Sequence, residues 1–130
     1  MNLNLDNETT DSKPSFYFKK DKKLCLKREY ELVFKNGHRF KGEYLCFVVL
    51  NDCQTTKIGI IARKKEFHEA VQRNKVKRRL RELARLNFPV LLDNVWLVIQ
   101  TYPNVDKVAW KILHTDFLNL CQRAKLIKQI

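Results

Sequence analysis

The stretch EAVQRNKVKRRLRELARL, residues 69–86, decides the fold. Its apolar residues follow a helical pattern, and a strand-like run lies on either side of it. KIGIIA precedes it at residues 57–62, and NVWLVIQT follows it at residues 94–101. Both runs are rich in the β-branched residues that favour strands. The second run is apolar almost throughout, which is typical of a strand covered on both faces. A helix between two such strands predicts helices packed on a sheet.

The central helix has two chemically different faces. At 100° per residue, four apolar side chains fall within an arc of about 100°, and they form the predicted buried stripe: Val76, Leu80, Leu83 and Ala84. The opposite arc carries the polar stripe of Asn74, Lys77, Arg78, Arg81 and Arg85. Lys75 and Arg79 lie on a flank of the helix, and Arg73 lies at the edge of the core side.

Like charges four residues apart repel each other in a helix, and here only Glu82 is near enough to relieve them. This pattern favours a surface that binds phosphates over a merely solvated face. An interfacial membrane helix is the weaker alternative, because the opposite face lacks the Trp and Phe that are usual there.

Working outward, the pattern of Leu26, Tyr30, Val33 and Phe34 predicts a short helix. Asn36-Gly37 should end it, with Gly37 in a left-handed cap. Strands are predicted around residue 39 and over 44–50, and a long amphipathic helix over 109–124. The predicted fold is α+β, a two-layer sandwich of order α-β-β-β-α-β-α. We expect residues 1–22 to form a flexible tail with a basic end and residues 23–130 to form a single domain.

Charge and composition restrict the function classes. The 130 residues carry a formal net charge of +12. Residues 13–41 and 63–85 each hold ten basic and three acidic residues, which favours a polyanionic partner. A soluble protein with solvated basic faces is the alternative. No apolar run is long enough to span a membrane, and the polar start excludes a signal peptide.

The four cysteines form no C-x-x-C pair and have no histidine at zinc-ligand spacing. We expect them to be reduced and the protein to be cytoplasmic, without a bound metal. The sequence also lacks H-x-x-x-H, G-x-S-x-G and a carboxylate cluster for two metals. No catalytic residue is therefore predicted in this chain.

Several segments in fixed spacing resemble the signature of the bacterial ribonuclease P protein subunit. They are Ile58-Gly59-Ile60, Lys64-Lys65, Ala70-Val71, Arg73-Asn74, Val76-Lys77-Arg78 and Arg81-Glu82, with Leu26-Lys27, Tyr30, Val33-Phe34 and Gly37 upstream. The resemblance covers about residues 23–122 and implies a left-handed β-α-β crossover, which physical rules alone would not favour.

The resemblance implies a non-catalytic role in ribonuclease P. The RNA partner would hold the active site and the Mg²⁺ ions, so the protein needs no cofactor of its own. The protein would bind that RNA, with 1:1 stoichiometry, and the 5′ leader of precursor tRNA. The implied RNA-binding residues are Lys64, Lys65, Arg73, Asn74, Lys75, Lys77, Arg78, Arg81 and Arg85, and the implied leader cleft contains Tyr30, Phe34, Val48 and Arg63.

The sequence departs from the family pattern at four places. Lys75 replaces an Arg, Arg63 replaces a Ser, and residues 66–69 form a loop that is one residue longer than common. Val48 stands at a position that is often aromatic. Two other hypotheses stay open at this point: a general RNA- or DNA-binding module of the ribosome-associated type, and a protein-only nuclease. The missing acidic residues speak against the nuclease. From the residues alone, Tyr30 and Phe34 fit an ordinary core better than a leader site.

Overall fold

The computed structural model describes residues 22–103 and 105–127, so the predicted tail lies almost wholly outside the described residues. The elements follow the predicted order. They are α1 (Lys27–Asn36), β1 (His38–Lys41), β2 (Leu45–Leu50), β3 (Lys57–Ile61), α2 (Ala70–Asn87), the 3₁₀ turn η2 (Phe88–Val90), β4 (Trp96–Thr101), the 3₁₀ turn η3 (Val105–Lys107) and α3 (Trp110–Arg123). The α+β class and the order α-β-β-β-α-β-α are therefore confirmed.

The four strands form one mixed sheet in the order β1-β2-β4-β3. β2 pairs antiparallel with both β1 and β4, whereas β3 pairs parallel with β4. Parallel neighbours need a crossover connection, and α2 supplies it. The left hand of this crossover stays a prediction from the resemblance.

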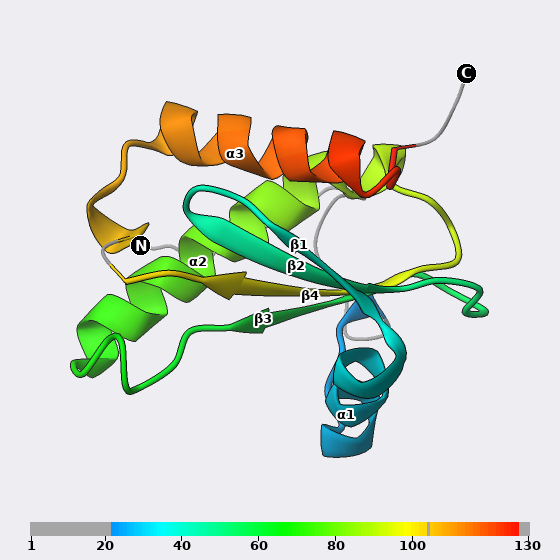
Figure 1. Cartoon of the computed structure of the whole chain (residues 1–130). Helices are drawn as coiled ribbons and strands as arrows, with labels where there is room; N and C mark the ends of the chain where they lie inside the picture. Colours follow the sequence, from blue (N-terminus) through cyan, green and yellow to red (C-terminus); the bar gives the residue numbers. More distant parts are fainter. Residues whose placement is uncertain (1–21, 104, 128–130) are drawn as a thin grey trace, which may run out of the picture.

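Helices cover both faces of the sheet (Figure 1), with α2 and α3 on one face and α1 on the other. Side chains alternate along β2, so Phe47 faces the larger core while Val48 packs with Val33 of α1. In the larger core, the rings of Phe47 and Phe117 meet edge to face, with centroids 5.3 Å apart. The structure thus refines the predicted two-layer sandwich, because α1 adds a layer of its own.

The end of α1 corrects one local prediction. Gly37 has a φ of −83°, so it is extended and not a left-handed cap. The reason for a glycine is close approach, because a Cβ at this position would lie 2.5 Å from the carbonyl oxygen of Val33 and 2.9 Å from that of Val49. Gly37 therefore lets the helix end directly against β2.

Glu29 anchors the other end of α1 to the sheet. Its carboxylate accepts hydrogen bonds from the backbone N–H groups of Cys25 (2.9 Å) and Leu26 (3.1 Å) and from the Lys57 ammonium (2.9 Å). Burial would raise the pKa of Glu29, but these hydrogen bonds and the Lys57 charge lower it to about 2. The ion pair joins α1 to the first residue of β3.

Candidate RNA interface

The two faces of α2 are separated as the sequence predicts. The buried residues of the helix are Val76, Leu80, Leu83 and Ala84, the predicted stripe. On the opposite side Asn74, Arg78 and Arg81 are exposed, while Lys77 and Arg85 are half-buried. Lys75 on the flank is also exposed. We call the side chains of Asn74, Lys77, Arg78, Arg81 and Arg85 the polar stripe.

Two of the predicted RNA-binding arginines also have partners within the protein. Arg73 donates from Nη1 to the backbone oxygens of Phe67 (2.8 Å) and His68 (3.0 Å), so it holds the loop before α2. Arg85 is paired with Glu82 one turn earlier, and this hydrogen bond raises the pKa of Arg85. Lys64 and Lys65 in the same loop are exposed. The guanidinium groups of Arg78 and Arg81 are therefore the freer ones for phosphate contacts.

Arg79 has a structural role that the sequence did not reveal. Its guanidinium donates to the backbone oxygens of Val105 (3.2 Å), Asp106 (3.3 Å) and Val108. These three carbonyls belong to η3 and the segment that leads to α3. Arg79 thus joins α2 to that segment and points away from the polar stripe.

Tyr30 and Phe34 lie on the side of α1 that meets the sheet. Both are half-buried and pack with the small core of Val33, Val48 and neighbouring residues. The Tyr30 hydroxyl donates to the backbone oxygen of Leu24 (3.2 Å), and burial raises its pKa. The Tyr30 ring fills the space over Gly59, where a Cβ would lie 2.7 Å from ring atoms. Tyr30 is therefore a half-buried packing residue.

The Phe34 ring makes a cation–π contact with a neighbouring arginine. The guanidinium of Arg39 on β1 lies 5.6 Å from the ring centroid, within the range of a cation–π contact. Arg39 itself is exposed. A base that stacked on Phe34 would meet this guanidinium as well, so Arg39 belongs to the candidate site although the sequence analysis did not select it.

The strand register defines the part of the sheet beside these rings. Cys46 shares the α1 side of β2 with Val48, and its partners on β1 and β4 are Lys41 and Gln100. Gln100 in turn pairs with Ile61, the last residue of β3. We call Lys41, Cys46, Gln100 and Ile61 the α1-side row.

The α1-side row lies on the Tyr30 flank of α1. Along β3, Lys57 binds Glu29, Gly59 lies under Tyr30, and Ile61 comes next on the same face. Ile61, at the β3 end of the row nearest Tyr30, and Gln100 are half-buried, while Lys41 at the β1 end is exposed, so the row offers polar and charged atoms along this side of α1. These residues could not be found from the sequence, because pairing across strands carries no local signal.

One predicted leader residue, Val48, is placed differently from the prediction, while Arg63 stays a prediction. Val48 is 0% exposed and packs under α1, so it cannot contact a strand of RNA, and this part of the prediction is corrected. A β-branched side chain at this position simply completes the small core. Arg63 is exposed at the end of β3, and its Nη2 donates to Oε2 of Glu66 (3.1 Å). That ion pair holds Arg63 toward its own loop.

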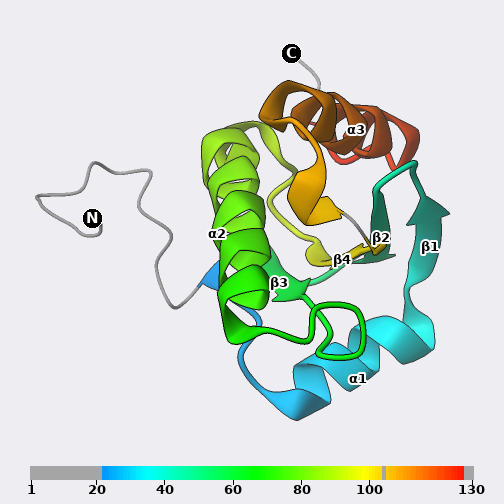
Figure 2. The same cartoon turned by 90° about the vertical axis from the view of Figure 1, so that its left-hand side faces the viewer.

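The loop of residues 62–69, which we call the basic loop, lies at the same end of the sheet as the α1-side row. Residues 62–69 follow the end of β3 and lead directly into α2, which places Lys64, Lys65 and Arg73 at the end where the α1-side row lies. Figure 2 shows this loop between the first turn of α2 and α1. The cations of this loop and the α1 side of the sheet thus lie at the same end of the molecule.

Within residues 22–103 and 105–127, no group of three or more His, Cys, Asp or Glu side chains is placed to hold a metal ion. None of the helices described is long and apolar enough to cross a membrane. The four cysteines are all free thiols. What the site offers is hydrogen-bond donors, positive charge and ring faces, which suits the binding of a nucleic acid strand.

Comparisons with known proteins point to one family. The family model for ribonuclease P matches residues 18–125. The ribonuclease P protein component of Finegoldia magna is 36% identical over 106 residues, which cover 80% of this chain and 93% of the relative. That of Thermotoga maritima is 32% identical over 113 residues, which cover 82% of this chain and 94% of the relative.

Solved structures show the same fold. The ribonuclease P protein from Thermotoga maritima superposes with a TM-score of 0.69 at 28% identity, over 78% of this chain and 96% of the other. The protein from Staphylococcus aureus superposes with a TM-score of 0.73 over 82% of this chain and 98% of the other, at 18% identity, and so supports the fold alone. From the match over residues 18–125 and the identity to these relatives, we conclude that this chain belongs to the ribonuclease P protein family.

Proposed function

We propose that this ribonuclease P subunit binds the catalytic RNA through α2 and the 5′ leader of precursor tRNA beside α1. The observation that carries the proposal is the polar stripe, in which Asn74, Arg78 and Arg81 are exposed, on a helix whose first turn lies next to the loop between α2 and α1. In this proposal the RNA holds the active site and its Mg²⁺, and one protein binds one RNA in the cytoplasm. Protein binding helps to remove the leader and so gives the mature 5′ end of the tRNA.

The polar stripe suits a folded RNA because its groups address the backbone. The forked guanidinium groups of Arg78 and Arg81 can each hold a phosphate by two hydrogen bonds, and the Asn74 amide adds a donor and an acceptor. Such contacts fix the register of the protein on the RNA but carry no base sequence. The subunit would therefore recognise the position and shape of its RNA.

The α1 side suits a single strand. The rings of Tyr30 and Phe34 are one helical turn apart, and unpaired bases of any identity can stack on such rings. Arg39 and Lys41 stand at the same side and can neutralise the leader phosphates. By holding the leader, the protein would make the holoenzyme bind precursor tRNA more tightly than mature tRNA. The substrate would then stay bound until it is cleaved, and the mature tRNA would be released more readily.

A reconstitution assay tests the proposal against a general RNA- or DNA-binding module. The full chain should restore leader cleavage by a bacterial ribonuclease P RNA at a low Mg²⁺ concentration at which the RNA alone is nearly inactive. If the protein contacts roughly 5 to 8 phosphates, log K against log[salt] should have a slope of roughly −4 to −7. Tight, salt-sensitive binding without any rescue of cleavage would instead support the general module.

A second assay tests the leader site. Phe34→Leu keeps apolar bulk but removes the ring, and stacking is worth roughly 1 to 3 kcal/mol per base. The holoenzyme should then bind precursor tRNA about tenfold more weakly, as expected for a loss of about 1.4 kcal/mol, and should bind mature tRNA almost unchanged. A fall in melting temperature with unchanged discrimination would show that Phe34 serves only the core.

A further inference from the structure

We propose that Asp116 of α3 is a positioning residue for the 5′ leader of precursor tRNA. It fixes the turn between β1 and β2, and the turn fixes Lys41 on the α1 side of the sheet. The inference rests on the proposed leader site and adds to it a residue from the opposite side of the sheet. Asp116 is only 9% exposed, so it acts through the turn and not through contact with RNA.

The Asp116 carboxylate accepts hydrogen bonds from three consecutive backbone N–H groups. Its Oδ1 accepts from the N–H of Glu43 (3.1 Å), and its Oδ2 accepts from those of Tyr44 (3.0 Å) and Leu45 (3.0 Å). A carboxylate suits this task, because both of its oxygens accept and neither donates. Such charge-assisted hydrogen bonds are stronger than those between neutral groups. The turn is therefore attached firmly to α3.

Gly42 shows how closely the turn and the carboxylate approach each other. A Cβ on Gly42 would lie 2.8 Å from each carboxylate oxygen of Asp116 and 2.9 Å from Cδ1 of Leu120. The Tyr102 N–H donates to the oxygen of Tyr44 (3.1 Å), which also joins the turn to the end of β4. Figure 2 shows the turn after β1 next to α3. The glycine thus allows the turn to lie directly on Asp116.

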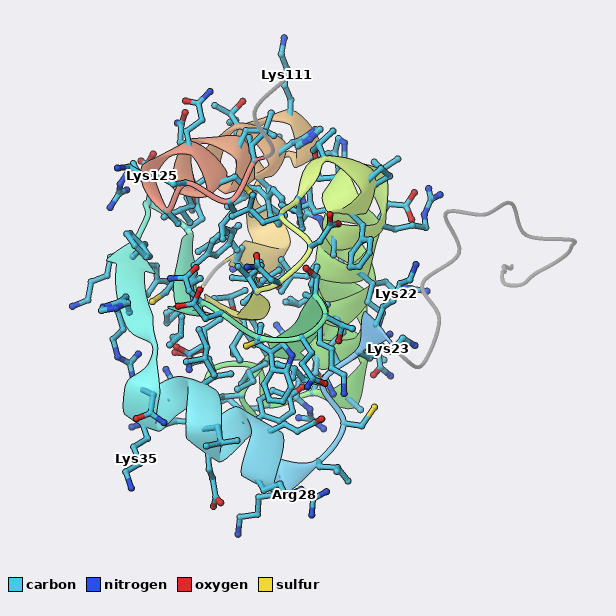
Figure 3. All side chains as sticks on the ribbon, turned by 90° about the vertical axis from the view of Figure 1, so that its right-hand side faces the viewer. Lys22, Lys23, Arg28, Lys35, Lys111 and Lys125 are labelled. Carbon is cyan, nitrogen blue, oxygen red and sulfur yellow. The ribbon has the colours of Figure 1, made fainter. Side chains whose placement is uncertain are left out.

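The strand β1 depends on this turn for its position. It has only four residues, lies at the edge of the sheet and pairs with β2 alone. Elements with few buried contacts and exposed backbone hydrogen bonds open easily. Figure 3 shows β1 running from the end of α1 that carries Lys35 toward α3. Because Lys41 comes directly before the turn, the hydrogen bonds to Asp116 limit its movement.

Lys41 faces the proposed leader site. Phe40 packs against the larger core, on the side of α2 and α3, so its neighbours Arg39 and Lys41 face the side of α1. The contact of Arg39 with the Phe34 ring agrees with this direction. Lys41 is exposed, and its ammonium can neutralise a phosphate of a strand that stacks on the rings of α1.

The test measures how tightly the holoenzyme, reconstituted with a bacterial ribonuclease P RNA, binds precursor and mature tRNA at several KCl concentrations. The variants are Asp116→Ala, Lys41→Ala and the double variant. Leu113→Val is the control for stability, because it changes a buried apolar residue of the same helix. Lys111→Ala is the control for charge, because this side chain points away from the sheet (Figure 3). Melting temperatures are measured beside them, and binding is measured where every variant is folded.

Lys41→Ala should bind precursor tRNA roughly 3- to 5-fold more weakly, as for one lost exposed charge contact. Its salt slope should fall by about 0.7, as for one phosphate of a single strand. Asp116→Ala should reproduce both changes, although the loss of a negative charge would by itself strengthen RNA binding. Because Asp116 acts through Lys41, the double variant should lose little more than either single variant. Mature tRNA should bind all variants almost equally, and both controls should keep the wild-type preference for precursor tRNA.

Two milder variants test the same contact without removing the side chain of Asp116. In Asp116→Asn one oxygen becomes an amide nitrogen, which cannot accept a hydrogen bond, so precursor binding should fall between those of wild type and Asp116→Ala. Gly42→Ala should displace the carboxylate from the side of the turn and weaken precursor binding. Combined with Asp116→Ala it should add little further loss.

Two results would overturn the inference. In one, Asp116→Ala and Asp116→Asn lower the melting temperature but keep the wild-type preference for precursor tRNA, as Leu113→Val should, so that Asp116 serves the fold alone. In the other, the losses at Asp116 and Lys41 multiply in the double variant, which would mean that the two residues act independently. If Phe34→Leu still weakens precursor binding in either case, the proposed leader site stands without Asp116. If the wild-type holoenzyme itself does not prefer precursor tRNA, the leader site fails and this inference fails with it.

Discussion

Adjacent arginines on α2 should respond to truncation in opposite ways. Arg78 is exposed on the polar stripe, whereas Arg79 donates to the carbonyl oxygens of Val105, Asp106 and Val108. Arg78→Ala should weaken binding to the catalytic RNA and leave the fold stable. Arg79→Ala should destabilise the fold and leave the RNA affinity of the folded protein nearly unchanged.

The magnitude follows from the hydrogen bonds of Arg79. Hydrogen bonds to charged groups contribute up to about 3 kcal/mol each, but Arg79 is half-buried and the freed carbonyls can reach water. Taking about 1 kcal/mol for each of the three gives a loss of about 3 kcal/mol in the free energy of unfolding. For a domain of this size the melting temperature should fall by roughly 10 to 15 °C. Arg78→Ala should change stability by less than about 0.5 kcal/mol.

The assay combines thermal unfolding, followed by circular dichroism, with RNA binding at a temperature where every variant is folded. Arg79→Lys is the matched control, because it keeps the charge but loses the forked geometry, and its stability should fall between those of wild type and Arg79→Ala. Suppose instead that Arg79→Ala keeps its melting temperature within about 3 °C of wild type, far less than the roughly 10 to 15 °C expected, and loses RNA affinity as Arg78→Ala does. The separation of the two faces of α2 would then be refuted.

Three further predictions concern α1, β3 and the end of α3. The pKa of Glu29 is lowered from 4.5 to about 2 by hydrogen bonds from the Cys25 N–H, Lys57 and the Leu26 N–H. These contacts should add stability above pH 4.5 and lose that effect as the pH falls toward 2, so urea midpoints of wild type and Glu29→Gln should converge in acid. Gly59→Ala should cost about 1 to 3 kcal/mol by displacing the Tyr30 ring, and Gly59→Ala with Tyr30→Leu should cost less than the sum of the singles in urea denaturation. Lys125 has a φ of 55° just after α3, so Lys125→Gly should stabilise the fold by roughly 0.5 to 1 kcal/mol in the same assay.

Local patterns predicted the elements well because each pattern depends on residues near in sequence. The apolar spacing of Val76, Leu80 and Leu83 determined which face of α2 is buried, and the apolar run at residues 94–101 identified β4. Amphipathicity cannot tell which side of a sheet a helix covers. That is why the layer formed by α1 was not predicted.

The sequence predicted only those residues of the candidate site that belong to the family signature or follow from helical periodicity. The α1-side row depends on pairing between strands that are far apart in sequence, as for Lys41 with Cys46 and Gln100 with Ile61. The role of Arg79 depends on backbone carbonyls, which every residue has and which no pattern distinguishes. Val48 was misplaced because an apolar residue fits a ring-lined surface and a core equally well in sequence.

The concentration of positive charge on α2 raises the question of why the helix stays folded in the free protein. Repulsion between Lys77 and Arg81 and between Arg81 and Arg85 costs about 0.2 to 0.5 kcal/mol per pair, and the pairing of Arg85 with Glu82 relieves part of it. On the buried face, Leu80 and Leu83 are each 0% exposed, and full burial of such a side chain contributes about 1.5 to 3 kcal/mol. Burial therefore outweighs the repulsion several-fold, so α2 stays folded although Arg81 forms no ion pair with any other residue that the structure describes. The charge that destabilises the helix slightly is then available for phosphates without any rearrangement of the fold.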